Sequence, residues 1–66
     1  MGRNWLAKIR SEKKLSQYIV AENAGISQSF YAAIETGSRG NKLPVQTARK
    51  IASVLEFDWR RFYEVD

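Results

Sequence analysis

The dipeptide Ser-Gln begins two neighbouring helical patterns, at residues 16–17 and 27–28. A serine that caps a helix leaves the first backbone N–H groups available at that end. These N–H groups and the helix dipole attract anions, phosphate included. The glutamine amides beside them can donate and accept hydrogen bonds. The spacing therefore predicts polar binding of phosphates and base edges rather than a bond-making reaction.

The chain offers little for catalysis or metal binding. It contains no Cys and no His, so the commonest catalytic base and the usual nitrogen and sulfur metal ligands are missing. Its seven acidic residues are scattered, and no glycine-rich phosphate loop is present. We therefore expect no enzyme activity, no metal site, no cofactor and no small-molecule ligand.

Positive charge lies on both sides of a central segment. The 66 residues include 11 Lys and Arg against 7 Asp and Glu, a formal net charge of +4, and residues 15–38 contain no Lys or Arg. This balance favours an acidic partner. No apolar run approaches the roughly 20 residues of a membrane span, and no signal peptide is visible. We expect a cytoplasmic protein without membrane contact.

Apolar periodicity and capping residues predict an all-α fold of five helices in a single domain, residues 1–66. The expected helices cover about 5–13, 17–23, 28–36, 45–55 and 59–63. A Gly at 37 is expected to end the third helix. The expected N-caps are Asn4, Ser16, Ser27 and Asp58.

The second and third predicted helices are joined by Ala24-Gly25-Ile26. Gly25 can adopt a positive φ, which a sharp turn between crossed helices needs. The small Ala21 permits the two helices to approach closely. Two short helices with this spacing form a helix-turn-helix pattern.

The pattern extends over residues on both helices and around the turn, namely Leu15, Ser16-Gln17, Val20-Ala21, Ala24-Gly25-Ile26-Ser27, Tyr31, Ile34-Glu35 and Gly37. Through these residues the chain resembles, over about residues 5–63, the phage Cro/repressor-type helix-turn-helix family, also called the XRE family. Three residues depart from the family pattern. Ala24 replaces a larger aliphatic, Tyr31 replaces Ile or Val and needs a partner for its hydroxyl if buried, and Glu56 replaces a helix-closing Gly.

The resemblance implies a compact repressor-like domain that binds double-stranded DNA in a sequence-specific way and regulates transcription, as a repressor. A helical wheel places four small or uncharged residues together on the outward face of the third helix. Gln can bond an adenine edge, Ser several base edges, and Ala can contact a thymine methyl in the major groove. The expected base-reading residues are Gln28, Ser29, Ala32 and Ala33.

The resemblance also implies a set of phosphate contacts. Gln17, with Ser16 at the start of the second helix, is expected to bind one phosphate. Arg39, Asn41 and Lys42 are expected to lie along the DNA backbone. The alternative is a solvated basic loop that has no partner. In the family an Arg on the first helix pairs with a Glu near the end of the third, which implies a structural ion pair of Arg10 with Glu35. Arg10 is also a candidate phosphate contact.

The last helix carries an aromatic cluster that suggests self-association. Trp59 is either an exposed homodimer contact or a core residue folded onto Trp5. A homodimer would present two reading helices about 34 Å apart to a pseudo-palindromic operator. The alternative function is a protein-interaction module on the same fold, antitoxin-like or anti-repressor-binding. Steep weakening by salt would indicate phosphate binding instead.

Overall fold

The computed structural model describes residues 3–37 and 43–64, and within these ranges every regular element is helical. The order is α1 (Asn4–Glu12), α2 (Gln17–Ala24), α3 (Gln28–Thr36), α4 (Val45–Leu55) and a 3-10 helix, η2 (Trp59–Tyr63). The all-α prediction is confirmed. The prediction of five α-helices is one too many, because the last segment makes i→i+3 bonds such as Arg61 N–H to Asp58 O at 3.0 Å.

Three of the four predicted N-caps accept the expected backbone hydrogen bond. The Ser16 and Ser27 hydroxyls each accept at 3.1 Å from the third residue beyond, and Asp58 accepts from the Arg60 N–H. The prediction of Asn4 as a cap is wrong, because Asn4 is already helical and Arg3 holds the cap position without a side-chain bond. The Arg3 N–H donates instead to the carbonyl of Glu35 at 2.7 Å, so a contact with α3 fixes where α1 begins.

Left-handed residues end three of the helices. Gly25 and Gly37 follow α2 and α3 with φ of 74° and 84°, as their positions predict. Glu56 ends α4 with φ 62° and ψ 53°, the conformation expected for the glycine it replaces. A side chain with a Cβ is strained there. The Glu56 carboxylate accepts a bond from Lys13 at 2.8 Å on the surface, which adds little stability.

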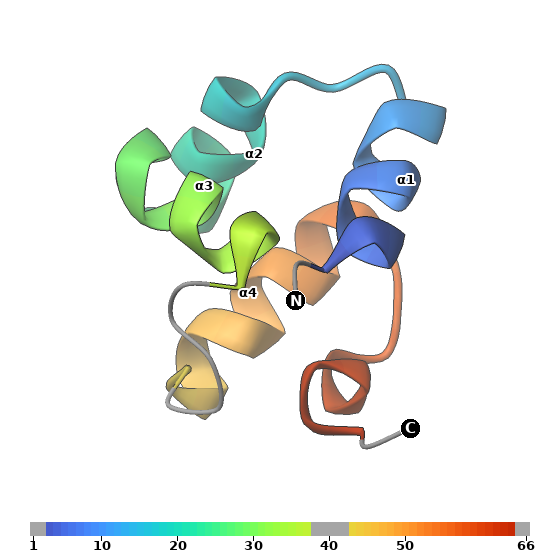
Figure 1. Cartoon of the computed structure of the whole chain (residues 1–66). Helices are drawn as coiled ribbons and strands as arrows, with labels where there is room; N and C mark the ends of the chain where they lie inside the picture. Colours follow the sequence, from blue (N-terminus) through green and yellow to red (C-terminus); the bar gives the residue numbers. More distant parts are fainter. Residues whose placement is uncertain (1–2, 38–42, 65–66) are drawn as a thin grey trace.

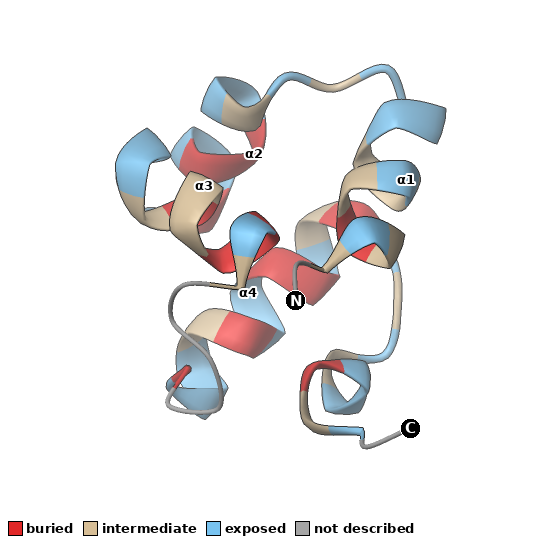
Figure 2. Cartoon of the chain, in the orientation of Figure 1, coloured by how far each residue is buried: buried red, intermediate tan, exposed pale blue. Residues whose placement is uncertain are grey.

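The core lies where α2, α3 and α4 meet, and α1 and η2 close it from the other side (Figure 1). Figure 2 shows the buried residues on the inward faces of the helices. The largest side chains that are fully buried are Tyr31, Leu6, Ile34, Ile51, Leu55 and Val20. In the ranges described above, the helices are too short or too polar to cross a membrane.

Candidate nucleic-acid interface

The helix-turn-helix consists of α2, a turn at Gly25 and α3. The turn is fixed by two backbone bonds, from Gly25 N–H to Glu22 O at 3.1 Å and from Ile26 N–H to Ala21 O at 2.9 Å. A Cβ built on Gly25 would have no atom within 4 Å, so the glycine is required by its positive φ rather than by a lack of space. The Ser27 cap then begins α3 immediately after the turn.

The two faces of α3 differ in burial as the helical wheel predicts. Tyr31, Ile34 and Glu35 are buried, and Phe30 is half-buried against the core. The four predicted reading residues lie on the other face, where Gln28 and Ser29 are exposed and Ala32 and Ala33 are half-buried. The outward face at the start of α3 is therefore uncharged and low in relief. Such a face can approach base edges closely without removing a charge from water.

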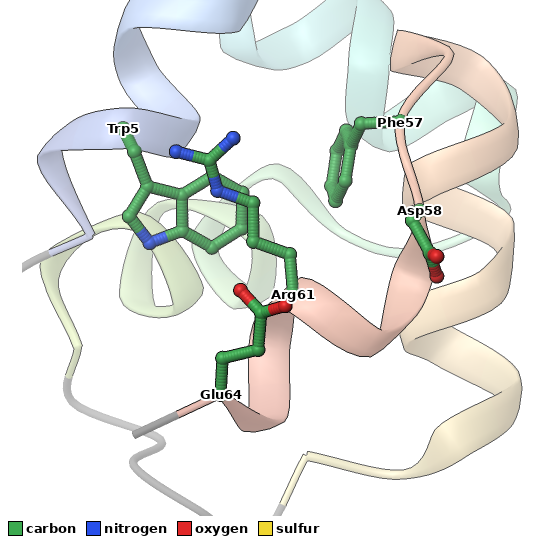
Figure 3. Close-up of a pocket in the computed structure, with 5 residues that line it drawn as sticks. All are labelled: Trp5, Phe57, Asp58, Arg61 and Glu64. Carbon is green, nitrogen blue, oxygen red and sulfur yellow. The ribbon is translucent and has the colours of Figure 1, made fainter. Parts of the chain in front are cut away.

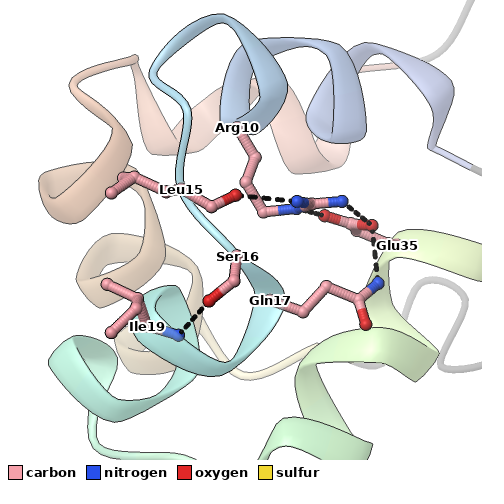
Figure 4. A network of polar contacts seen from close by, with 6 residues as sticks. All are labelled: Arg10, Leu15, Ser16, Gln17, Ile19 and Glu35. Atoms are coloured by element: carbon pink, nitrogen blue, oxygen red, sulfur yellow. Dashed lines mark hydrogen bonds and ion pairs between the residues drawn. The ribbon is translucent and has the colours of Figure 1, made fainter.

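One carboxylate connects the two helices of the motif to α1 (Figure 4). Arg10 donates from Nε to Glu35 Oε2 at 2.6 Å and from Nη2 to Oε1 at 3.3 Å. Its Nη1 donates to the carbonyl of Leu15 at 2.8 Å, in the segment between α1 and α2. The amide of Gln17 donates to Glu35 Oε1 at 2.9 Å. Arg10 and Glu35 therefore hold α1, the start of α2 and the end of α3 in one arrangement.

The Arg10–Glu35 pair is largely shielded from water, with side-chain exposures of 19% and 6%. Burial alone would raise the pKa of Glu35, but the hydrogen bonds from Arg10 and Gln17, the polar contact with the Tyr31 hydroxyl and the charge of Arg10 outweigh it, so this pKa is lowered. The pKa of Arg10 is raised, chiefly by its hydrogen bond to Glu35. Both groups are charged at neutral pH, and each depends on the other for compensation of its burial.

The structure describes some of the residues predicted to contact phosphates but not others. Ser16 is exposed at the start of α2, with its hydroxyl engaged in the cap. Gln17 is half-buried, and its amide is directed at Glu35 rather than outward. The structure does not describe residues 38–42, so the predicted contacts Arg39, Asn41 and Lys42 lie outside the described residues.

Trp59 is half-buried on η2, where its ring lies 6.0 Å from that of Tyr63 and 5.9 Å from the Arg49 guanidinium. Trp5 packs elsewhere: its ring meets the edges of two phenylalanines, Phe57 at 5.3 Å and Phe62 at 5.4 Å. The alternative in which Trp59 folds onto Trp5 requires the two indoles to be neighbours. The aromatic neighbours of Trp5 are instead Phe57 and Phe62.

Sequence reasoning missed two cavities. An open cavity of about 380 Å³ is lined by Trp5, Phe57, Asp58, Arg61 and Glu64, and the Arg61 guanidinium stacks on the Trp5 indole at 4.6 Å (Figure 3). A smaller one, of about 290 Å³, lies between α2 and the start of α3. Its lining includes Tyr18, Ile26 and Gln28. In residues 3–37 and 43–64, no group of acidic side chains is arranged to hold a metal ion.

The comparisons with known proteins agree with this geometry. A helix-turn-helix family model matches residues 6–62. The chain is 44% identical over 64 residues to the "Uncharacterized HTH-type transcriptional regulator YqaF" of Bacillus subtilis (strain 168). The aligned segment covers 97% of this chain and 82% of that relative. No solved structure is significantly similar to this chain.

Proposed function

This chain belongs to the helix-turn-helix family of DNA-binding transcriptional regulators, and we propose that it acts as a repressor that reads the major groove of double-stranded DNA with α3. The family and the relative indicate a regulator and not an enzyme. The observation that carries the proposal is the uncharged outward face at the start of α3, with Gln28 and Ser29 exposed.

Gln28 is the proposed principal reading residue. It is exposed at the first position of α3. Its amide can form two hydrogen bonds with one adenine edge. Ser29 adds a hydroxyl, and the half-buried Ala32 and Ala33 permit the helix to approach the bases.

We expect contacts with the DNA phosphates on both sides of this face. Gln17 and Ser16 lie at the positive end of α2, which favours a phosphate. Arg39, Asn41 and Lys42 follow α3 in the sequence and would supply charge and further donors. Arg10 uses three N–H groups within the protein, which leaves two for a phosphate.

The proposed assembly is a homodimer on a pseudo-palindromic operator, with Trp59 at the contact. Trp59 offers a partly exposed indole on η2, a type of residue that often anchors interfaces. Two protomers would place their α3 helices in successive major grooves about 34 Å apart. Because a repressor must meet its operator where the genome lies, the cytoplasm stays the proposed compartment.

A binding selection on random duplexes, at several salt concentrations, tests this function. We expect a preferred sequence and a steep fall of affinity with salt. The Gln28→Ala variant should bind the preferred site about 5- to 150-fold more weakly, equivalent to about 1–3 kcal/mol, and should lose preference at one base pair. Gln46→Ala removes an exposed glutamine from α4 and is the matched control. An unchanged preference profile in Gln28→Ala would refute the assignment.

One observation favours the second candidate, a protein-interaction module. Tyr18 and Ile19 are exposed on α2, and the smaller cavity lies between Tyr18 and Gln28. An apolar partner segment could be held there. Binding of such a partner would change little between low and moderate salt, in contrast to binding of phosphates.

A further inference from the structure

The hydroxyl of Tyr31 is a buried polar group without a hydrogen bond. The Tyr31 side chain is fully buried in the core. Among the residues that the structure describes, its hydroxyl is the one buried side-chain polar atom that lacks a partner. Buried polar groups in folded proteins are nearly always bonded, so an exception calls for a physical reason.

This hydroxyl faces the carboxylate that organises the motif. Tyr31 and Glu35 are one turn apart on the buried face of α3, where side chains four residues apart are neighbours. The pKa of Tyr31 is raised, first by burial and then by a polar contact between its hydroxyl and the Glu35 carboxylate that falls short of a well-formed hydrogen bond, so the two groups lie close together. The hydroxyl nevertheless forms no bond of acceptable geometry. In this arrangement Glu35 receives its hydrogen bonds from Arg10 and Gln17.

Of the two donors to Glu35, Gln17 is the one that DNA would draw away. Arg10 is held by two bonds to the carboxylate and a third to the carbonyl of Leu15. Gln17 is held by a single bond from its amide. Figure 4 shows the amide nitrogen of Gln17 directed at Glu35, which is buried. A phosphate outside that accepts from the N–H now bonded to Glu35 requires the amide to turn away from this carboxylate.

We propose that Tyr31 is a positioning residue for DNA binding: when Gln17 leaves Glu35 for a phosphate, the Tyr31 hydroxyl replaces it as a donor to the same carboxylate. This inference rests on the proposed phosphate contact of Gln17. One hydrogen bond to Glu35 is lost and one is gained, while the Gln17 amide gains the phosphate. The unbonded hydroxyl of the free protein thus becomes bonded in the complex, and the Arg10–Glu35 pair remains intact.

The test compares four proteins on the selected operator: the unsubstituted chain, Tyr31→Phe, Gln17→Ala and the double variant. Tyr31→Phe should bind about 3- to 10-fold more weakly, the order of one net hydrogen bond, with an unchanged base preference. In the Gln17→Ala background the same substitution should change affinity less than about 2-fold, because no Gln17 amide remains to be replaced.

Stability separates this role from a merely structural one. Tyr31→Phe should be at least as resistant to thermal unfolding as the unsubstituted chain, because it removes a buried group that lacks a partner. Tyr63→Phe is the matched control: its hydroxyl donates to the Leu43 carbonyl at 2.6 Å, so its loss should lower the Tm. Weaker DNA binding by a more stable protein is the expected signature.

Three results would overturn the inference while leaving DNA binding itself established. The first is operator affinity of Tyr31→Phe equal to that of the unsubstituted chain. The second is an effect of Tyr31→Phe that is undiminished in the Gln17→Ala background. The third is a lower Tm for Tyr31→Phe, which would mean that the hydroxyl is already bonded in the free protein. Failure of the unsubstituted chain to bind any duplex would instead refute the proposed function and this inference together.

Discussion

The Arg10–Glu35 pair provides the sharpest test of how this small domain is stabilised. In the unsubstituted protein the Glu35 carboxylate is 6% exposed, and replacing Arg10 by Met leaves it with the single hydrogen bond from Gln17. Breaking one partner of a buried pair costs about 3–5 kcal/mol. The chain has 66 residues, so its whole free energy of unfolding is about 3–10 kcal/mol. Arg10→Met should therefore lose about a third or more of the free energy of unfolding.

Replacing the other partner, Glu35→Met, should lower the free energy of unfolding by less, about 2–3 kcal/mol. The loss of about 3–5 kcal/mol applies to a buried charge left without any partner. The remaining guanidinium is 19% exposed and keeps its bond to the Leu15 carbonyl. The double variant Arg10→Met, Glu35→Met leaves no buried charge, and it removes the partners only of neutral, half-buried groups, the Leu15 carbonyl and the Gln17 amide. It should be more stable than Arg10→Met alone, by about 1–3 kcal/mol.

Urea unfolding followed by circular dichroism at 222 nm measures all four proteins, with a common slope m as the check that they unfold alike. The order expected for the free energy of unfolding is unsubstituted chain, then the double variant, then Arg10→Met. A double variant whose loss equals the sum of the two single losses would refute the reasoning, since the pair would then act as independent packing groups.

Three further predictions follow from the same structure. Glu56→Gly should raise the Tm by about 2–6 °C, because glycine accepts the left-handed conformation at φ 62° without strain; a lower Tm in calorimetry would show that the surface bond to Lys13 matters more. Because the folded-state pKa of Glu35 is lowered, its contribution to stability is present above the ordinary value of 4.5 and is lost as the pH falls through the folded value. Urea midpoints at a series of pH values should therefore fall less steeply in acid for Glu35→Gln than for the unsubstituted chain, and parallel curves would contradict this. Trp59→Gln should shift sedimentation of the protein–operator complex from two protomers toward one, and an intact dimer would exclude the proposed contact.

Where the local chemistry of the chain decides a boundary, the sequence was sufficient. Ser16 and Ser27 cap their helices through bonds that span three residues, and Gly25 and Gly37 supply the left-handed ends. The start of α1 was not predictable in this way. It depends on Arg3, whose N–H and guanidinium bond to carbonyls near the end of α3, far away in the sequence. Distant contacts of this kind override local capping preference.

In the candidate site, too, local sequence predicts some features, and others depend on contacts between residues far apart in the sequence. The exposed positions of Gln28 and Ser29 follow from helical periodicity, and both side chains are exposed in the structure. The bond between Gln17 and Glu35 joins residues 18 apart, so no local pattern could indicate it. The sequence predicted that a buried Tyr31 would need a partner, but only the packed structure shows that none is in place.

The uncharged reading face has a physical consequence for how affinity must arise. Residues 15–38 carry no Lys or Arg, so the face itself adds no long-range attraction to DNA. In the proposed complex, attraction comes from basic segments on both sides, and phosphate contacts set the register of α3 in the groove. That register is meaningful only if α2 and α3 hold a fixed relation. The Arg10–Glu35 pair provides this relation, since Arg10 on α1 bonds both the Glu35 carboxylate on α3 and the Leu15 carbonyl just before α2, and the pair stays intact when Gln17 turns to a phosphate. In the proposed complex the buried pair would therefore let an uncharged helix read the base sequence, because discrimination there depends on the rigid placement of α3 rather than on its charge.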